Sequence, residues 1–218
     1  MFKKKPYFIV FEGIEGSGKS YQSSKLFKNL KKKGLDVLIT REPGGTPNAE
    51  KIRKLILTDY FVKNKNKNFD KYTDTLLYLA ARNEHVKNKI RPALKKKQIV
   101  ICDRFVDSTI SYQVYGKKVK KKFIENIHNE ILGKLRPNLT FILKVNLKTS
   151  RSRLRKRKKK NRYDNFSNKF YQNAQKGFLY KKNNNKNYII FDSSRNTPEL
   201  EKKILEIVLK RFKAGMSK

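Results

Sequence analysis

The sequence predicts an α/β fold in which a five-stranded parallel sheet is flanked by helices. Five short apolar runs recur along the chain, and each has the near-continuous apolar character of a strand that is covered on both faces. Helical spacing appears between the first three runs and after the last, and strands that alternate with helices form βαβ units. The 218 residues are expected to form one domain, residues 1–218.

The predicted strands are residues 7–11 ("YFIVF"), 36–40 ("DVLIT"), 98–102 ("QIVIC"), 139–145 ("LTFILKV") and 187–191 ("NYIIF"). Helices are expected at about residues 19–34, from residue 48, at about residues 73–90, and from residue 198. Gly34 is a plausible helix stop, and Thr197 is a candidate N-cap before Pro198, which suits the first helical position. The polar stretch 63–71 ("KNKNKNFDK") is expected to be an exposed, mobile loop.

A phosphate-binding loop is predicted between the first strand and the first helix. Residues 13–20 ("GIEGSGKS") fit G-x-x-x-x-G-K-[ST], in which glycines let backbone N–H groups point at phosphate oxygens. Lys19 would reach the β- and γ-phosphates, and Ser20 would offer its hydroxyl to Mg²⁺. The alternative, a chance glycine-rich turn, rarely stands between an apolar strand and a helix. The sequence therefore predicts a nucleoside triphosphate site formed by Gly13, Ile14, Glu15, Gly16, Ser17, Gly18, Lys19 and Ser20.

Two residues at the end of the third strand indicate a metal site and a second anion site. Because parallel strands bring their carboxyl ends to one edge of the sheet, Asp103 and Arg104 should lie beside the phosphate loop. Asp103 can support Mg²⁺, or it can cap the segment that follows. Arg104 is placed to fork onto a phosphate. With Arg41, Arg53 and Arg82 expected at the same crevice, the acceptor is expected to carry a phosphate, although each arginine alone could be a solvated charge.

Two further stretches bear on the acceptor and on catalysis. In "LLYLAAR", Tyr78 lies one helical turn before Arg82, so the ring could stack on a base and the guanidinium could bond to the base edge. The alternative is a core tyrosine beside a surface arginine. The basic run 150–162 ("SRSRLRKRKKKNR") could be a solvated helix face, a nucleic-acid tail or a mobile lid that brings an arginine to the transferring phosphate. Because the phosphate loop contains no arginine, the lid is favoured.

The chain is strongly basic, with 55 Lys and Arg against 18 Asp and Glu, a formal charge of +37. Nucleic-acid binding is one interpretation. The excess is spread along the chain and is mostly Lys accompanied by Asn, Ile, Phe and Tyr, which favours biased codon usage. No apolar run approaches a membrane span, and no secretion signal is recognisable. The one cysteine, Cys102, cannot form an internal disulfide, so the sequence predicts a cytoplasmic protein that needs neither membrane nor nucleic acid.

Taken together, the motifs resemble those of the thymidylate kinases, the dTMP kinases among the P-loop nucleoside-monophosphate kinases. The resemblance covers nearly the whole chain through "FEGIEGSGKS", "TREPGGTPNAEKIRKLIL", "LLYLAAR", "DRFVDSTISYQ", "LRPNLTFIL", "RKRKKKNRYD" and "FDSSRNTPEL", in the family's order. It implies the three-layer P-loop kinase fold with a mobile arginine-rich lid at about residues 150–163. It also implies ATP-dependent phosphorylation of dTMP to dTDP with Mg²⁺, in dTTP biosynthesis, by a homodimer of the bacterial type.

The resemblance also implies roles for individual residues. Residues 13–20 would bind ATP, the catalytic residues would be Lys19, Asp103, Arg104 and Arg157, and the metal ligands would be Ser20 and Asp103. The dTMP site would be formed by Glu15, Arg53, Tyr78, Arg82, Arg104, Ser108, Thr109, Tyr112 and Gln113.

The resemblance also implies which part of dTMP each of these residues would contact. Arg53 and Arg104 would hold the phosphate, Tyr78 would stack on thymine, and Arg82 would bind a thymine carbonyl. Ser108, Thr109 and Gln113 would complete the base and phosphate pocket. Glu15 would bond to the sugar 3′-OH, directly or through the metal shell, and Tyr112 would crowd C2′ and disfavour ribose.

Arg157 would be the lid arginine, with Arg155 and Arg162 as rivals within the same basic run. Phe105 and Val106 depart from the more polar residues common in the family after Asp-Arg, and "QVYGKK" is poorer in glycine than usual. Two functional alternatives stay open: another nucleoside or nucleotide kinase, and a basic ATPase that binds nucleic acid. The second would have no need for the acceptor stretch "DRFVDSTISYQ".

Overall fold

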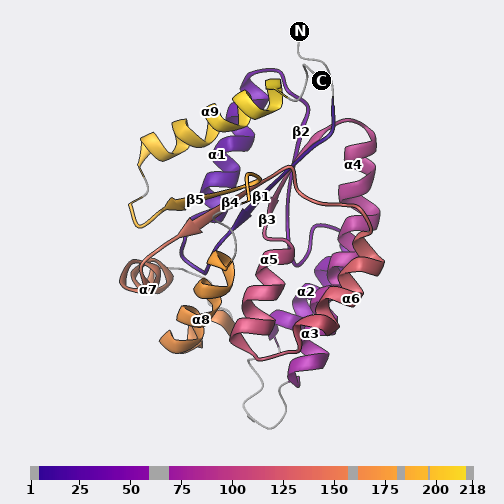
Figure 1. Cartoon of the computed structure of the whole chain (residues 1–218), viewed down its shortest axis with the longest axis vertical. Coiled ribbons are helices and arrows are strands. Elements are labelled where there is room, and N and C mark those ends of the chain that lie inside the picture. Colours follow the sequence, from indigo (N-terminus) through magenta and orange to yellow (C-terminus); the bar gives the residue numbers. More distant parts are fainter. Residues whose placement is uncertain (1–4, 59–68, 157–161, 181–184, 196, 215–218) are drawn as a thin grey trace.

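The sheet has five parallel strands, as the sequence predicts (Figure 1). The computed structural model describes residues 5–58, 69–156, 162–180, 185–195 and 197–214. The strands are β1 (Tyr7–Glu12), β2 (Val37–Arg41), β3 (Ile99–Asp103), β4 (Leu139–Lys144) and β5 (Tyr188–Asp192). They lie in the order β2-β3-β1-β4-β5, and each neighbouring pair is parallel. The ends of β1 and β3 are therefore adjacent.

The helices that surround the sheet are α1 (Lys19–Lys32), α2 (Pro47–Thr58), α3 (Lys71–His85), α4 (Arg91–Lys95), α5 (Val106–Thr109), α6 (Lys121–Leu132), α7 (Leu147–Arg155), α8 (Asn168–Leu179) and α9 (Pro198–Ala214). Among the described residues the chain also forms two π-helices, η3 (Val86–Ile90) and η4 (Ile110–Gly116), and a 3₁₀ turn, η5 (Arg162–Asn165). The four predicted helices correspond to α1, α2, α3 with η3, and α9. Within the described ranges, no helix is long and apolar enough to cross a membrane.

Helices α1 and α9 cover one face of the sheet (Figure 1). Side chains alternate between the two faces along a strand, so Ile9 and Phe11 of β1 point to this side. They pack in one buried cluster with Leu30 of α1 and with Ile204 and Val208 of α9. This cluster holds α1 against the sheet and so sets the position of the loop that precedes it.

The opposite face of the sheet is covered by helices that lead to the acceptor side of the predicted site. Phe8 and Val10 of β1 meet Ile90 of η3, Ala93 of α4 and Leu132 of α6 in a second buried cluster. A third cluster forms where η4 and α8 pack against the end of β4. Helices on both faces of one sheet make three layers, which confirms the predicted fold class.

The helical stretch after α3 extends past the predicted end near residue 90. The N–H of Arg91 bonds to the carbonyl of Val86, and the chain then continues as α4 through Pro92 to Lys95. Pro92 stands in the first turn of α4, where its missing N–H removes no hydrogen bond of that helix. Pro92 therefore lies within a helical stretch that continues past it and does not mark the end of that stretch.

The beginning of α3 is fixed by an N-cap that the sequence analysis placed in a loop. The Asp70 carboxylate accepts hydrogen bonds from the N–H groups of Tyr72 (2.7 Å) and Thr73 (3.3 Å). Of the predicted exposed loop 63–71, residues 63–68 lie outside the described residues, while Phe69 and Asp70 are exposed as predicted and Lys71 begins α3.

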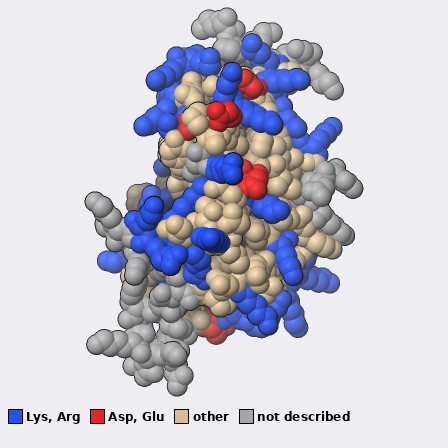
Figure 2. Space-filling view, turned by 90° about the vertical axis from the view of Figure 1, so that its left-hand side faces the viewer, with Lys and Arg blue, Asp and Glu red and all other residues tan. Residues whose placement is uncertain are grey.

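Basic side chains are spread over the surface and do not gather in one patch on the face shown in Figure 2. Lys and Arg occur over most of that face, and Asp and Glu are few. This distribution agrees with the interpretation that the positive charge is a property of the whole chain.

Candidate active site

The phosphate loop joins β1 to α1, as predicted. Gly16 and Gly18 have φ of 71° and 88°, a left-handed conformation that glycine adopts at little cost. The Lys19 ammonium is buried and donates to the carbonyl of Ile14 at 2.8 Å. Burial, together with the positive charge of Arg104, lowers the pKa of Lys19 to about 8. The loop thus contains a cation whose environment would favour a bound anion.

Ser20 and Asp103 meet at the ends of β1 and β3. The hydroxyl of Ser20 donates to Oδ2 of Asp103. Oδ1 of Asp103 is buried and has no hydrogen-bond partner among the described residues. A hydroxyl and a carboxylate are oxygen ligands of the kind that Mg²⁺ takes, usually together with phosphate oxygens and water. The pair therefore fits a magnesium ion, and no group of three His, Cys, Asp or Glu elsewhere in the described ranges offers a fuller set of ligands.

Arg104 turns back from the end of β3 over the phosphate loop. Its backbone is left-handed, with φ of 75°. Its guanidinium donates to the carbonyl of Gly13 (3.0 Å), to Oγ of Ser108 (3.1 Å) and to Oε1 of Glu15 (2.7 Å). The hydroxyl of Tyr112 donates to the other oxygen of Glu15, and its ring lies 5.3 Å beneath the Arg104 guanidinium. One arginine thus connects the loop, the end of β3 and the helix η4.

The protonation states of this group follow from its neighbours. Burial alone would lower the pKa of Arg104, but Glu15 and the nearby oxygens outweigh burial and raise it. Burial and the charge of Glu15 raise the pKa of Tyr112 well above its ordinary value. At neutral pH Arg104 is a cation and Tyr112 is a neutral hydrogen-bond donor.

Glu12, the last residue of β1, holds the segment that carries Arg104. Its Oε1 accepts from the N–H groups of Phe105 (2.8 Å) and Ser108 (3.2 Å), and its Oε2 accepts from the Ser108 hydroxyl (2.6 Å). Burial, with the nearby charge of Asp107, raises the pKa of Glu12 to about 7. This carboxyl is a support beneath the site that the sequence analysis did not identify.

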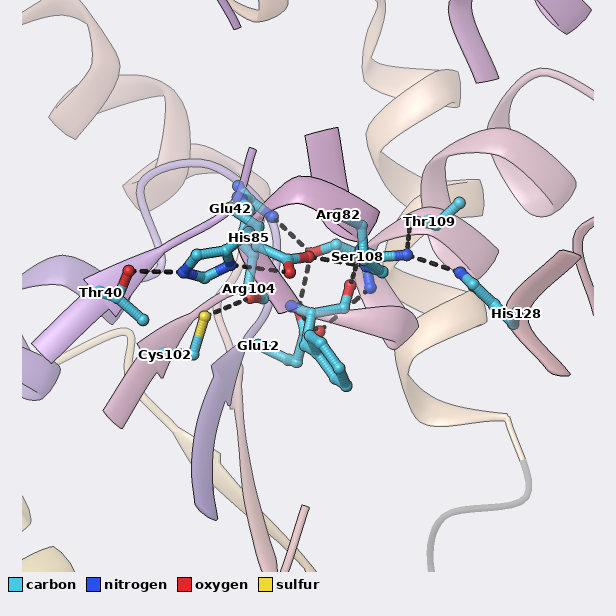
Figure 3. Close-up of polar contacts among 11 residues, drawn as sticks. Glu12, Thr40, Glu42, Arg82, His85, Cys102, Arg104, Ser108, Thr109 and His128 are labelled. Carbon is cyan, nitrogen blue, oxygen red and sulfur yellow. Dashed lines mark hydrogen bonds and ion pairs between the residues drawn. The ribbon is translucent and has the colours of Figure 1, made fainter. Parts of the chain in front are cut away.

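Arg82 of α3 lies in a buried polar network (Figure 3). It donates to Glu42 (2.7 Å), to Thr109 (2.8 Å), to Nε2 of His128 (2.6 Å) and to the carbonyl of Phe105 (2.8 Å). These bonds use all but one of the N–H groups of the guanidinium. Arg82 lines the cavity described below, so it can offer one N–H to a ligand, fewer than a free arginine would.

The partners of Arg82 are themselves held in place. Burial and the charge of Arg82 lower the pKa of His128 to about 2, so its ring is neutral and accepts the bond. The second oxygen of Glu42 bonds to Nδ1 of His85 (3.0 Å), and Nε2 of His85 bonds to Thr40 (2.7 Å). Burial alone would raise the pKa of Glu42, but Arg82 and His85 hold it below its ordinary value. Arg82 therefore has little orientational freedom.

Two polar atoms of residues that line the cavity have no hydrogen-bond partner among the described residues. They are the hydroxyl of Tyr78 and Oε1 of Gln113, and both are buried. Burial raises the pKa of Tyr78, so its hydroxyl stays protonated. Gln113 lies in η4, and π-helical turns often occur at functional sites. Unpaired buried polar groups in a cavity wall fit a ligand that carries donors and acceptors.

The two remaining predicted arginines, Arg41 and Arg53, also line this cavity. Arg41 is exposed and pairs with Glu50 at 3.1 Å. Arg53 donates to the carbonyl of Pro43 at 2.7 Å, and burial lowers its pKa. Arg53 remains a better phosphate ligand than Arg41, because no carboxylate is paired with it among the described residues.

The cavity has a volume of about 490 Å³ and brings the predicted donor and acceptor residues together. Its lining includes Glu15, Gly16, Gly18, Lys19, Ser20, Arg41, Arg53, Tyr78, Arg82, Asp103, Arg104, Ser108, Thr109, Tyr112 and Gln113. Gly13, Ile14 and Ser17 of the loop do not line it. Motifs that are distant in the sequence thus meet at one edge of the sheet, as the sequence predicts.

The predicted lid is described only at its two ends. Arg157, the predicted lid arginine, lies outside the described residues. Arg155 is exposed at the end of α7. Arg162 is buried, pairs with Asp74 of α3 at 2.5 Å and donates to the carbonyl of Ile56 at 2.8 Å. Of the two rivals to Arg157, Arg162 is therefore engaged in holding the end of the basic run against α2 and α3.

Known proteins resemble this chain in sequence and in fold. The profile of the family "Thymidylate kinase" matches residues 11–204. The chain belongs to the thymidylate kinase family. It is 37% identical over 209 residues to the thymidylate kinase of Mycoplasma capricolum, covering 94% of this chain and 96% of that one. The thymidylate kinase of Wolbachia pipientis subsp. Culex pipiens is 40% identical over 215 residues, covering 96% and 98%.

A solved structure agrees with this assignment. The crystal structure of thymidylate kinase from Ehrlichia chaffeensis matches with a TM-score of 0.71 at 30% identity, covering 94% of this chain and 99% of that one. Members of the thymidylate kinase family are phosphotransferases that act on dTMP.

The sequence analysis missed several residues of the cavity and of the polar network behind it. Arg153 and Tyr163 line the cavity. Arg153 is hidden in the basic run 150–162, where nothing in the sequence separates it from its neighbours. Glu42 lies within the family stretch "TREPGGTPNAEKIRKLIL", which could have directed attention to it. His128 is a lone histidine in α6, for which the sequence contains no signal.

Proposed function

We propose that the chain transfers the γ-phosphoryl group of ATP to the 5′-phosphate of dTMP, giving dTDP and ADP. The observation that carries this proposal is that one cavity is lined both by the phosphate loop and by the acceptor residues that follow β3. Arg104, which follows β3, donates to Glu15 of the phosphate loop at 2.7 Å and so connects the two groups.

The donor would be held by the phosphate loop. Gly16 and Gly18 let backbone N–H groups face the phosphates, and Lys19 would exchange its bond to Ile14 for the β- and γ-phosphates. Mg²⁺ would be held by Ser20 and Asp103, and it would supply charge neutralisation on the phosphate oxygens. Oδ1 of Asp103, which is buried and has no hydrogen-bond partner within the described ranges, supports this role.

The acceptor would lie against η4 and α3. Arg104 and Arg53 would hold its phosphate, and Tyr78 would stack on thymine. Arg82 and Gln113 would bond to the base edge. Oε1 of Gln113, which has no partner in the part of the chain that the structure describes, is a suitable acceptor of the thymine N–H.

The sugar and the pocket wall would be contacted by the residues beside Arg104. Glu15 would bond to the 3′-OH, and Tyr112 would crowd C2′, which favours deoxyribose. Ser108 and Thr109 would complete the wall, as supports for Arg104 and Arg82.

Catalysis would consist of positioning and charge neutralisation. A phosphate oxygen is already anionic, so the nucleophile needs no strong protein base. Lys19 and Arg104 would neutralise the two phosphates as they approach. Arg157 would add positive charge to the transferring group when the lid segment, about residues 150–163, covers the site.

We also propose a homodimer in the cytoplasm, formed by a chain that folds as one domain. Leu55 of α2 and Leu76 of α3 are large apolar side chains that are about half exposed, and α2 and α3 pack on each other. Burying them against a second copy would remove them from water. Cys102, buried and unpaired, suits a reducing compartment. Light scattering of the purified chain tests the dimer, and a monomer at micromolar concentration would contradict it.

An acceptor panel tests the activity. ADP formation is measured with dTMP, UMP, thymidine and single-stranded DNA at equal ATP and Mg²⁺. We expect dTMP to give the highest kcat/KM. Turnover stimulated by thymidine or by DNA, and not by dTMP, would refute the proposal and favour a nucleoside kinase or a nucleic-acid-dependent ATPase.

A further inference from the structure

Helix α7 packs directly on the outer side of the phosphate loop. The hydroxyl of Ser150, a fully buried residue, donates to the carbonyl of Glu15 at 2.8 Å. One turn later, Arg153 donates to the carbonyl of Gly16 at 2.9 Å. Two neighbouring carbonyls of the loop are thus bound by one helix that lies more than 130 residues away in the sequence.

These two bonds fix the direction of N–H groups in the loop. In a trans peptide the carbonyl and the following N–H point to opposite sides of a planar unit. Because the Glu15 carbonyl points at α7, the N–H of Gly16 points away from it. The bond to the Gly16 carbonyl likewise turns the N–H of Ser17 away from α7, where it donates to the carbonyl of Ile14 at 3.3 Å and closes the turn of the loop. An anion-binding loop needs its N–H groups turned inward, so bonds that hold the carbonyls outward favour the binding conformation.

The contact is too close for any other residue at position 16. A Cβ added to Gly16 would lie 2.7 Å from the backbone oxygen of Ser150 and 3.1 Å from its Cα. Gly16 also has a left-handed φ of 71°. The backbone of α7 therefore touches the loop, and a shift of the helix would move the loop with it.

Arg153 donates hydrogen bonds to three backbone carbonyls. Besides the carbonyl of Gly16, it donates to those of Ser193 and Ser194, each at 3.0 Å, in the segment that follows β5. Burial lowers the pKa of Arg153. Its guanidinium thus connects the loop, α7 and the end of β5 even though part of it reaches the cavity.

We propose that Ser150 and Arg153 are positioning residues that hold the phosphate loop in the conformation that binds the donor triphosphate. They act on ATP through the carbonyls of Glu15 and Gly16. This inference rests on the proposed function in one respect, namely that the loop holds the triphosphate of ATP.

The test compares binding of ATP, inorganic tripolyphosphate and dTMP to purified variants by calorimetry at high ionic strength. Tripolyphosphate is included because it carries the phosphates without the nucleoside. We expect Ser150→Ala to weaken ATP and tripolyphosphate by the same factor, about fivefold to tenfold for one neutral hydrogen bond. Arg153→Met should weaken both by roughly tenfold to a hundredfold, as befits bonds from a charged donor. The affinity for dTMP should not change.

Arg151→Met is the matched control on the same helix. Arg151 donates to the carbonyl of Phe166 and to Asn168, which lie outside the phosphate loop. Its replacement by Met removes one positive charge, as Arg153→Met does. It should leave all three affinities as they are. Arg153→Lys is the second variant, which keeps the charge and should recover only part of the affinity because an ammonium cannot span the three carbonyls.

Two outcomes would overturn the inference. Unchanged tripolyphosphate binding by folded Ser150→Ala would show that the bond to Glu15 does not position the loop. Weakened ATP binding with unchanged tripolyphosphate binding in Arg153→Met would show that Arg153 contacts the nucleoside instead. Lys19→Met separates this failure from failure of the proposed function, because a loop that is not the donor site would keep its ATP affinity without Lys19.

Discussion

Replacing Glu42 by Gln tests whether the buried network behind Arg82 stabilises the fold through charge. Both side chains are 3% exposed, and they pair at 2.7 Å. Gln has almost the same shape, and its oxygen can still accept from Arg82 while its amide donates to Nδ1 of His85. The substitution therefore removes mainly the negative charge and leaves Arg82 buried without its counter-charge.

The expected loss in free energy of unfolding is about 3 kcal/mol. Breaking a buried ion pair by removing one partner costs roughly 3–5 kcal/mol, and the bonds that Gln retains place Glu42→Gln at the lower end. In a chain of this length 1 kcal/mol corresponds to a change in Tm of about 2–4 °C, so Tm should fall by about 6–12 °C. The control is Glu125→Gln, which removes an exposed pair with Lys121 (2.9 Å) and should cost only about 0.3–0.5 kcal/mol.

The pH dependence supplies the decisive comparison. The pKa of Glu42 is lowered in the folded state, so its stabilisation is fully present above its unfolded pKa of about 4.3 and is lost as pH falls through the folded value. The gap in unfolding free energy between the wild type and Glu42→Gln should be constant near neutral pH and should narrow in acid. Denaturant unfolding at several pH values measures it. A gap under 1 kcal/mol at neutral pH, or one that persists in acid, would refute the reasoning.

Three further predictions concern the site itself. ATP affinity of the free enzyme should fall as pH rises through about 8, where Lys19 loses its proton, and a titration flat from neutral pH to pH 9 would contradict this. Tyr112→Ala should lower the ratio of kcat/KM for dTMP to kcat/KM for its ribose analogue, while Tyr112→Phe, which keeps the ring, should not. An equal ratio in the two variants would show that the ring does not discriminate between the sugars. Arg157→Ala should lower kcat about 100-fold and leave dTMP binding nearly unchanged, and an unaltered kcat would assign the role to another arginine.

The sequence predicted the fold and the convergence of motifs because both depend on local patterns. Apolar runs and the spacing of Gly16, Gly18 and Lys19 are readable along the chain, and the common edge of parallel strands then places Asp103 and Arg104 beside the loop. The engagement of Arg82 could not be predicted in this way. Its partner His128 lies 46 residues away on another helix, and nothing in either neighbourhood signals the contact.

The placement of the acidic residues explains how so basic a chain can gather arginines and a lysine in one cavity. Glu12, Glu42 and Asp103 stand at the ends of β1, β2 and β3, three adjacent strands, although the chain has only 18 acidic residues in all. Each supports a different element of the site: Glu42 holds Arg82, Glu12 holds the backbone that follows Arg104, and Asp103 holds the first turn of α1. Cations buried together repel one another, so each needs either a carboxylate or a substrate phosphate nearby. Loss of any of these three carboxylates should therefore disturb the site far more than loss of a surface acid, even though each changes the net charge by the same single unit.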